Sequence, residues 1–158
     1  MSANLKKALY KVRVCHLKLV KVMRILFVCS GNAHRSPLAE ALLKKLRPDL
    51  EVESAGISTS IPISEAVKEY LAKENAGKCL KRVPENLTSK RLKDYDLIVA
   101  MEQRHKDAVV AMCAECEQRT VVWSVEDPYL LDHKDAERIY KQVEDKVREL
   151  AKSLQSTR

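Results

Sequence analysis

Short apolar runs alternate along this chain with longer segments whose apolar residues recur every three or four positions. Four short segments are predicted as strands: 24–28, 50–54, 96–101 and 119–125. Helical spacing predicts helices over 37–46, 65–75, 102–112 and 135–154, and a shorter helix that follows Thr88 and reaches Lys93. Strands that alternate with helices predict one α/β domain, in which right-handed crossovers place helices on both faces of a parallel sheet.

Polar residues and glycine mark the ends of several of these helices. Ser36, Ser64 and Thr88 are predicted to cap the helices that follow them, because a hydroxyl oxygen accepts a free backbone N–H there. Gly77 is predicted to end the helix over 65–75.

The first strand leads into the stretch with the clearest chemistry, Cys29-Ser30-Gly31-Asn32-Ala33-His34-Arg35. A loop that wraps over a helix N-terminus turns backbone N–H groups inward and forms an anion site. Gly31 and Asn32 tolerate the left-handed backbone that such a loop often needs. Arg35 adds a bidentate donor for an oxyanion, and the positive surroundings favour the thiolate of Cys29, which is then placed for in-line attack on phosphorus. The alternative interpretation is a buried strand-end cysteine and a surface arginine.

Asp127 stands far downstream, in an Asp-Pro-Tyr sequence just after the fourth predicted strand. The carboxyl ends of parallel strands meet at one edge of a sheet, so this loop is expected at the same edge as Cys29. An acid there would protonate a leaving oxygen and then deprotonate a water molecule. The alternative is that Asp-Pro is ordinary turn chemistry.

Length, cysteine content and net charge indicate the number of domains, the cellular compartment and the kind of partner. The length of 158 residues suits one domain with a substantial core, and no apolar run is long enough to span a membrane. Five cysteines, an odd number, argue against a secreted disulfide scaffold and favour the cytoplasm. Residues 1–22 hold six basic and no acidic residues, so the net charge of +7 leaves only +1 on residues 23–158, and nucleic-acid binding is not expected.

The segment 1–22 is a basic extension ahead of the predicted domain, 23–158. Its apolar spacing does not decide between helix and strand. Three interpretations compete: an artefact of the start site, with Met23 as the true start, a basic amphipathic segment that contacts a membrane or a partner, and a cleaved targeting segment.

Several stretches together resemble the low-molecular-weight protein-tyrosine phosphatases: CSGNAHRSP followed by LAEALL, ESAG at 53–56, DLIVAM at 96–101 and DPY at 127–129. The resemblance covers about residues 23–158 and includes the family's order, with the nucleophile near the N-terminus and the acid near the C-terminus. It implies a three-layer α/β/α domain with a four-stranded parallel sheet of order 2-1-3-4. It also implies a phosphocysteine intermediate, no cofactor or metal, a phosphorylated protein or a small aryl phosphate as substrate, and a monomer or weak dimer.

The same resemblance implies a role for each site residue. Cys29 is the nucleophile, Arg35 the phosphate clamp and Asp127 the general acid. Ser54 braces the loop, and Tyr129 lines the cleft. The other residues expected to bind phosphate or to support the loop are Ser30, Gly31, Asn32, Ala33, His34 and Ser36.

Departures from the family's pattern leave the substrate open. Family members often carry an aromatic residue after the second strand, whereas residues 57–63 contain none. Ala33 matches neither the family's preference for phosphotyrosine nor that for phosphoarginine at this position. Phosphoarginine, phosphoserine and phosphothreonine are therefore alternative substrates. Arsenate reduction and non-catalytic phosphoanion binding are weaker alternatives, since a reductase needs a relay cysteine where this chain has Met101-Glu102.

Cys113 and Cys116 form a Cys-x-x-Cys pair, a pattern found in redox and metal sites. Two cysteines alone do not make a zinc site. The preceding helix would carry the pair roughly 16 Å from the catalytic edge, so a structural disulfide or two free thiols are expected. His16 and His105 are interpreted as ordinary surface or core residues, and Cys15 and Cys79 have no predicted role.

Overall fold

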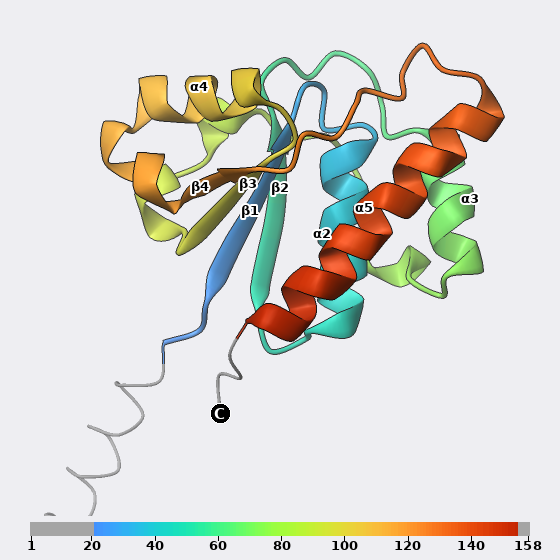
Figure 1. Cartoon of the computed structure of the whole chain (residues 1–158), viewed down its shortest axis with the longest axis horizontal. Coiled ribbons are helices and arrows are strands. Elements are labelled where there is room, and N and C mark those ends of the chain that lie inside the picture. The colour runs from blue at the N-terminus through green and yellow to red at the C-terminus, as the bar shows by residue number, and fades with distance from the viewer. Residues whose placement is uncertain (1–20, 155–158) are drawn as a thin grey trace, which may run out of the picture.

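The computed structural model describes residues 21–154, which form a three-layer α/β/α domain (Figure 1). Its strands and α-helices follow in the order β1 Arg24–Cys29, α2 Arg35–Leu46, β2 Glu51–Gly56, α3 Glu65–Lys73, β3 Leu97–Ala100, α4 Gln103–Met112, β4 Thr120–Val122 and α5 His133–Ser153. Short 3-10 turns connect them: η1 Gly77–Cys79, η2 Leu87–Ser89, η3 Leu92–Asp94 and η4 Ala114–Arg119. Apart from its last two residues, the predicted extension 1–22 lies outside the described residues. Within 21–154 no helix is long and apolar enough to cross a membrane.

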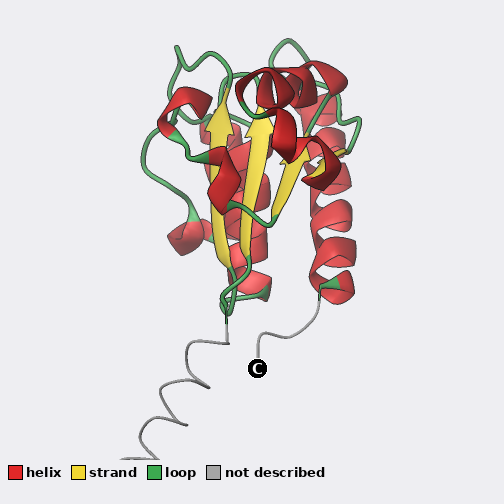
Figure 2. Cartoon of the chain, turned by 90° about the vertical axis from the view of Figure 1, so that its left-hand side faces the viewer, coloured by secondary structure: helices red, strands yellow, loops and turns green. Residues whose placement is uncertain are grey.

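The sheet has the predicted topology. Its four strands run parallel in the order β2-β1-β3-β4, and Cys29 at the end of β1 lies opposite Gly56 at the end of β2. Figure 2 shows the strands side by side between the helical layers. Helices α2 and α5 lie on one side of the sheet with α3 packed outside them, and α4 lies on the other side (Figure 1). The first strand and its loop are therefore central to the domain.

Side chains of β1 alternate between two apolar clusters, as the pleat of a strand requires. Ile25 and Phe27 pack into the cluster formed with α2 and α5, whereas Leu26 and Val28 pack into the cluster on the α4 side. Both faces of β1 are buried, which explains why the sequence reads as a continuous apolar run.

Several element boundaries differ from the prediction by one to three residues, and two of the differences have a clear physical reason. The fourth strand, expected over 119–125, is shorter, because Ser124 adopts a left-handed backbone with φ of 56°. The last helix begins two residues early, at His133, because Asp132 caps it: the Asp132 carboxylate accepts the N–H of Asp135 at 2.9 Å.

The predicted helix ends are partly wrong. Ser64 does cap α3, since its hydroxyl accepts a backbone N–H at 3.2 Å. Gly77 does not end that helix: Asn75 takes the left-handed conformation, with φ of 55°, and the helix stops before it. Thr88 is not a cap either, because Asn86 accepts the N–H of Thr88, and the expected short helix is two 3-10 turns.

Candidate active site

The loop from Cys29 to Arg35 leaves the carboxyl end of β1 and enters α2. Asn32 is left-handed, with φ of 53°, as predicted for this type of loop. Gly31 is not left-handed, so this reason for a glycine there was wrong. Arg35, rather than a residue after Ser36, begins the helix, and no side chain caps it.

Gly56 is the glycine that the loop requires, and the sequence did not single it out. A Cβ atom on Gly56 would lie 2.6 Å from the nitrogen of Asn32 and 2.8 Å from both the Gly31 carbonyl carbon and the Ser30 oxygen. The end of β2 thus presses directly against the backbone of the loop. Only a residue without a side chain permits this approach.

Ser36 lies beneath the nucleophile instead of capping the helix. Its Oγ is 2.9 Å from the Cys29 sulfur and accepts an N–H from the Asn32 amide at 2.8 Å. Asn32 also donates to Ser54 at 2.9 Å, so Ser54 braces the loop asparagine as expected. Because Ser36 accepts from Asn32, its own proton is left to donate, with the Cys29 sulfur at 2.9 Å and the Ala55 carbonyl at 3.4 Å as its partners.

Lys81, a lysine with a largely covered side chain that the sequence did not predict here, fixes this arrangement. The Lys81 ammonium donates to the Asn32 Oδ1 atom and to the Ser54 carbonyl, each at 2.8 Å, and its side chain is only 8% exposed. The backbone N–H of Glu85 donates to the same Asn32 oxygen at 2.9 Å. Both partners can only donate, which assigns the oxygen and nitrogen of the Asn32 amide and points its N–H groups toward Ser36.

The Arg35 guanidinium is almost completely buried, and protein groups hold both of its terminal nitrogens. Nη1 donates to Glu102 at 2.6 Å and to the Val125 carbonyl at 2.8 Å. Nη2 lies 3.2 Å from the Ser30 hydroxyl and 3.3 Å from the Asp127 carboxylate. An arginine has five N–H donors, so only Nε–H is left without a partner in these contacts.

Two side chains at the start of α4 support this arginine, and neither was expected in the site. Although burial pushes the pKa of Glu102 upward, hydrogen bonds from Arg104 and Arg35 hold it below its ordinary value. Glu102 is therefore an anion that fixes Arg35. His105, predicted to be ordinary, is fully buried and bonded to Ser30 at 2.9 Å. Burial, together with the positive charge of Arg35, lowers the pKa of His105 to about 4.

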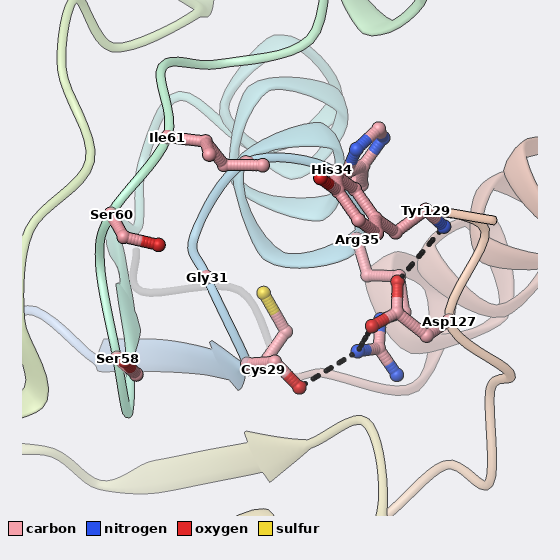
Figure 3. A pocket seen from close by; sticks show the side chains of 11 residues that line it. Cys29, Gly31, His34, Arg35, Ser58, Ser60, Ile61, Asp127 and Tyr129 are labelled. Carbon is pink, nitrogen blue, oxygen red and sulfur yellow. Dashed lines mark hydrogen bonds and ion pairs between the residues drawn. The ribbon is translucent and has the colours of Figure 1, made fainter.

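Cys29, Arg35 and Asp127 surround one open cavity of about 240 Å³ (Figure 3). Of the predicted phosphate-binding residues, Ser30, Gly31, Ala33, His34 and Tyr129 also line it. Asn32 and Ser36 do not line the cavity, because both residues are completely buried behind the loop backbone. The cavity is completed by Ser58, Ser60 and Ile61 from the aromatic-free loop after β2.

His34 connects the loop to two tyrosines. Its ring lies edge-on to Tyr129, with 6.2 Å between the ring centres, and its Nδ1 atom is 3.1 Å from the Tyr140 hydroxyl. Burial lowers the pKa of His34, partly offset by the charge of Asp127. Tyr129 itself is 58% exposed and stands at the rim of the cavity.

Cys113 and Cys116 form a disulfide between the end of α4 and η4. Cys79 is a free, half-buried thiol, and Cys15 and His16 lie outside the described residues. Over residues 21–154, no group of three or more His, Cys, Asp or Glu side chains is arranged to hold a metal ion.

Comparison with known proteins identifies the family. Residues 24–158 match the low molecular weight phosphotyrosine protein phosphatase family. The phosphatase Wzb from Escherichia coli is 32% identical over 144 residues, which cover 82% of this chain and 94% of Wzb. A structure of Wzb from Vibrio vulnificus in complex with benzylphosphonate is 31% identical, with a TM-score of 0.74 over 85% of this chain and 100% of that one.

A second kind of relative has a different named substrate. A mutant of YwlE from Bacillus subtilis is 29% identical, with a TM-score of 0.74 over 85% of this chain and 99% of that one. Another YwlE structure is described as an arginine phosphatase with a phosphorylated active-site serine. Because the family match spans the whole described domain and the relatives are covered almost end to end, the chain belongs to the low molecular weight protein-tyrosine phosphatase family and is an enzyme of that type.

Proposed function

We propose that this enzyme hydrolyses phosphotyrosine in proteins, and small aryl phosphates, through a phosphocysteine on Cys29. One observation carries the proposal: the cavity brings the Cys29 thiol, the buried Arg35 guanidinium and the Asp127 carboxylate together, although Asp127 is remote in sequence. These three groups supply a nucleophile, an anion clamp and an acid, the set that phosphoryl transfer through cysteine requires.

In the first step, the Cys29 thiolate attacks phosphorus while Asp127, protonated, gives its proton to the leaving oxygen as the phosphorus–oxygen bond breaks. The Ser36 hydroxyl, 2.9 Å from the sulfur, stabilises the thiolate before attack. Arg35 and the loop amides hold the charge on the phosphoryl oxygens. In the second step, Asp127 takes a proton from water, which attacks phosphorus and releases Cys29 as a thiolate.

Substrate binding has to displace one contact of the free enzyme. Bidentate binding of a phosphoryl group needs two adjacent N–H groups of Arg35, and the Asp127 carboxylate is paired with Nη2 at 3.3 Å. A phosphoryl group that takes this position releases Asp127 from its ion pair, next to where the leaving oxygen would lie. Binding of the phosphoryl group therefore also frees Asp127 to act as the general acid.

The lining of the cavity favours aryl substrates over phosphoarginine. Tyr129 and Ile61 offer apolar surface to a flat ring, whereas Asp127 is the only acidic side chain among the lining residues that the structure describes. A guanidinium leaving group would therefore have little negative charge to pair with. Selectivity for phosphotyrosine over phosphoserine and phosphothreonine is expected to be modest, since ring stacking adds only about 0.5–1.5 kcal/mol beyond burial.

The proposal also bears on compartment and assembly. The nucleophile must stay reduced, which favours the cytoplasm. One chain supplies every residue of the site, so a monomer or a weak dimer suffices. Neither nucleic acid nor a membrane is required, and membrane contact stays only one of the three competing interpretations of residues 1–22.

Turnover of p-nitrophenyl phosphate and of phosphotyrosine, phosphoarginine and phosphoserine peptides tests the proposal. Cys29→Ser is expected to abolish turnover and to keep phosphate binding, because Arg35 and the loop remain. Cys79→Ser, which removes the other described free thiol, is the matched control and is expected to keep full activity. Activity that survives in Cys29→Ser, or arsenate reduction in place of ester hydrolysis, would contradict the proposal.

A further inference from the structure

The hydrogen bonds around His105 determine which ring nitrogen carries its proton. Nδ1 of His105 lies 3.0 Å from the backbone nitrogen of Glu102, whose N–H can only donate. Nδ1 must therefore accept, and the single proton of the neutral ring sits on Nε2. The low pKa of this buried ring keeps it neutral at physiological pH.

This tautomer in turn determines the direction of the Ser30 hydroxyl. The Ser30 oxygen is 2.9 Å from Nε2 of His105 and 3.2 Å from Nη2 of Arg35, and both nitrogens are donors. Both lone pairs of the oxygen are thereby occupied, so its own proton must point elsewhere. No acceptor for that proton is found among residues 21–154. Ser30 follows the nucleophile and lines the cavity, which is where an acceptor would arrive.

We propose that the Ser30 hydroxyl is a direct hydrogen-bond donor to the bound phosphoryl group and that His105 is the positioning residue that orients it. The proposal rests on the proposed function, since it assigns a ligand atom within the same site. It adds a side-chain donor to the backbone amides and to Arg35. No acceptor among residues 21–154 takes this proton, so it is free to bond to a phosphoryl oxygen.

Residues at the start of α4 thus hold both terminal nitrogens of the Arg35 guanidinium, one directly and one through Ser30. Glu102 contacts Nη1 at 2.6 Å, whereas His105 acts on Nη2 through Ser30. The backbone and side chains of Glu102 and His105 also bond to each other in a capping box, so the two supports move together. The N–H of this buried histidine is thus bonded to a hydroxyl that lines the cavity.

Binding of inorganic phosphate, measured by calorimetry, tests the role of Ser30 without requiring turnover. Ser30→Ala is expected to raise the Kd roughly 10- to 100-fold, the usual effect of losing a hydrogen bond to a charged group. Ser89→Ala, which removes an exposed hydroxyl bonded to the Asn86 carbonyl, is the control and should leave the Kd unchanged. A Kd for Ser30→Ala within twofold of the wild type would overturn the proposal.

Two variants of His105 test whether it acts through Ser30. His105→Leu removes the donor and is expected to weaken phosphate binding as much as Ser30→Ala does. His105→Gln keeps a side-chain N–H that reaches Ser30 and should restore most of the affinity. In the Ser30→Ala background, His105→Leu should cost no further affinity. Additive losses, or no rescue by glutamine, would show that His105 is only structural.

The tautomer has a direct spectroscopic signature. Long-range proton–nitrogen NMR correlations of the wild type should show His105 neutral, with its proton on Nε2, and His133→Gln removes the resonances of an exposed histidine as an assignment control. A proton on Nδ1 would overturn the proposal. A wild type that binds phosphate but does not hydrolyse p-nitrophenyl phosphate would refute the proposed function and leave the role of Ser30 standing.

Discussion

Replacement of Gly56 by alanine is the most demanding test of how the phosphate loop is built. The new Cβ would lie 2.6–2.8 Å from three backbone atoms of the loop, distances at which something must move. The atoms that crowd it belong to the main chain of residues 30–32, so no flexible side chain can relieve the overlap. The loop must therefore shift away from β2.

The expected loss can be worked from typical overpacking. Forced repacking costs about 1–3 kcal/mol, and the lower entropy of the unfolded alanine variant returns at most about 1 kcal/mol. We expect Gly56→Ala to lose about 1–2 kcal/mol of unfolding free energy, or about 2–8 °C in Tm for a domain of this size. Catalysis should suffer more, because the shifted backbone carries the amides that hold phosphate.

Gly77→Ala is the matched control. A Cβ there meets no atom within 4 Å, and Gly77 does not use a left-handed backbone. It should therefore be neutral or slightly stabilising. The assay is urea unfolding together with phosphate affinity for all three proteins. If Gly56→Ala unfolds at the same urea concentration and binds phosphate as tightly as the wild type, the account of the loop is wrong.

Asp127→Ala should bind inorganic phosphate more tightly, because it frees Nη2 of Arg35, and should slow substrates with poor leaving groups far more than aryl phosphates; equal slowing of both classes would exclude an acid role. His105 has a pKa of about 4 in the fold against 6.5 when exposed, so the stability it contributes is complete above pH 6.5 and is lost as the pH falls toward 4. That loss amounts to roughly 3 kcal/mol, and urea unfolding of His105→Gln should show a flatter pH dependence over this range. Peroxide should drive Cys29 to the sulfinic acid with little rescue by dithiothreitol, because Cys113 and Cys116 are already bonded to each other; a disulfide from Cys29 to Cys79, mapped by mass spectrometry, would contradict this.

The loop was predictable because its signal is local. Cys29 and Arg35 stand a fixed few residues apart between a recognisable strand and a recognisable helix. The sheet order followed from resemblance, and the alternation of strands and helices predicted the layers. Errors at helix ends arose where two polar residues competed for one cap, as Asn86 did with Thr88.

The supporting residues were missed because long-range contacts define them. Lys81 meets Asn32 across 49 residues of sequence, Glu102 meets Arg35 across 67, and His105 meets Ser30 across 75. Nothing in the local sequence of these three residues distinguishes them from a surface lysine, a helix-start acid and a core histidine. One usable signal existed: Glu102 and His105 are spaced as a capping box at the start of a predicted helix.

The central claim is that Cys29 carries the phosphoryl group during turnover. The most direct measurement is rapid acid quench of Asp127→Ala with p-nitrophenyl phosphate, followed by intact-mass measurement and peptide mapping. A phosphorylated species is predicted to accumulate, because this variant still expels a good leaving group but lacks the base that activates water for the second step. The phosphate should map to Cys29 and be absent from Cys29→Ala/Asp127→Ala, in which residue 29 has no nucleophilic atom. Turnover with no phosphoenzyme at any time point, or phosphate on another residue, would contradict the account.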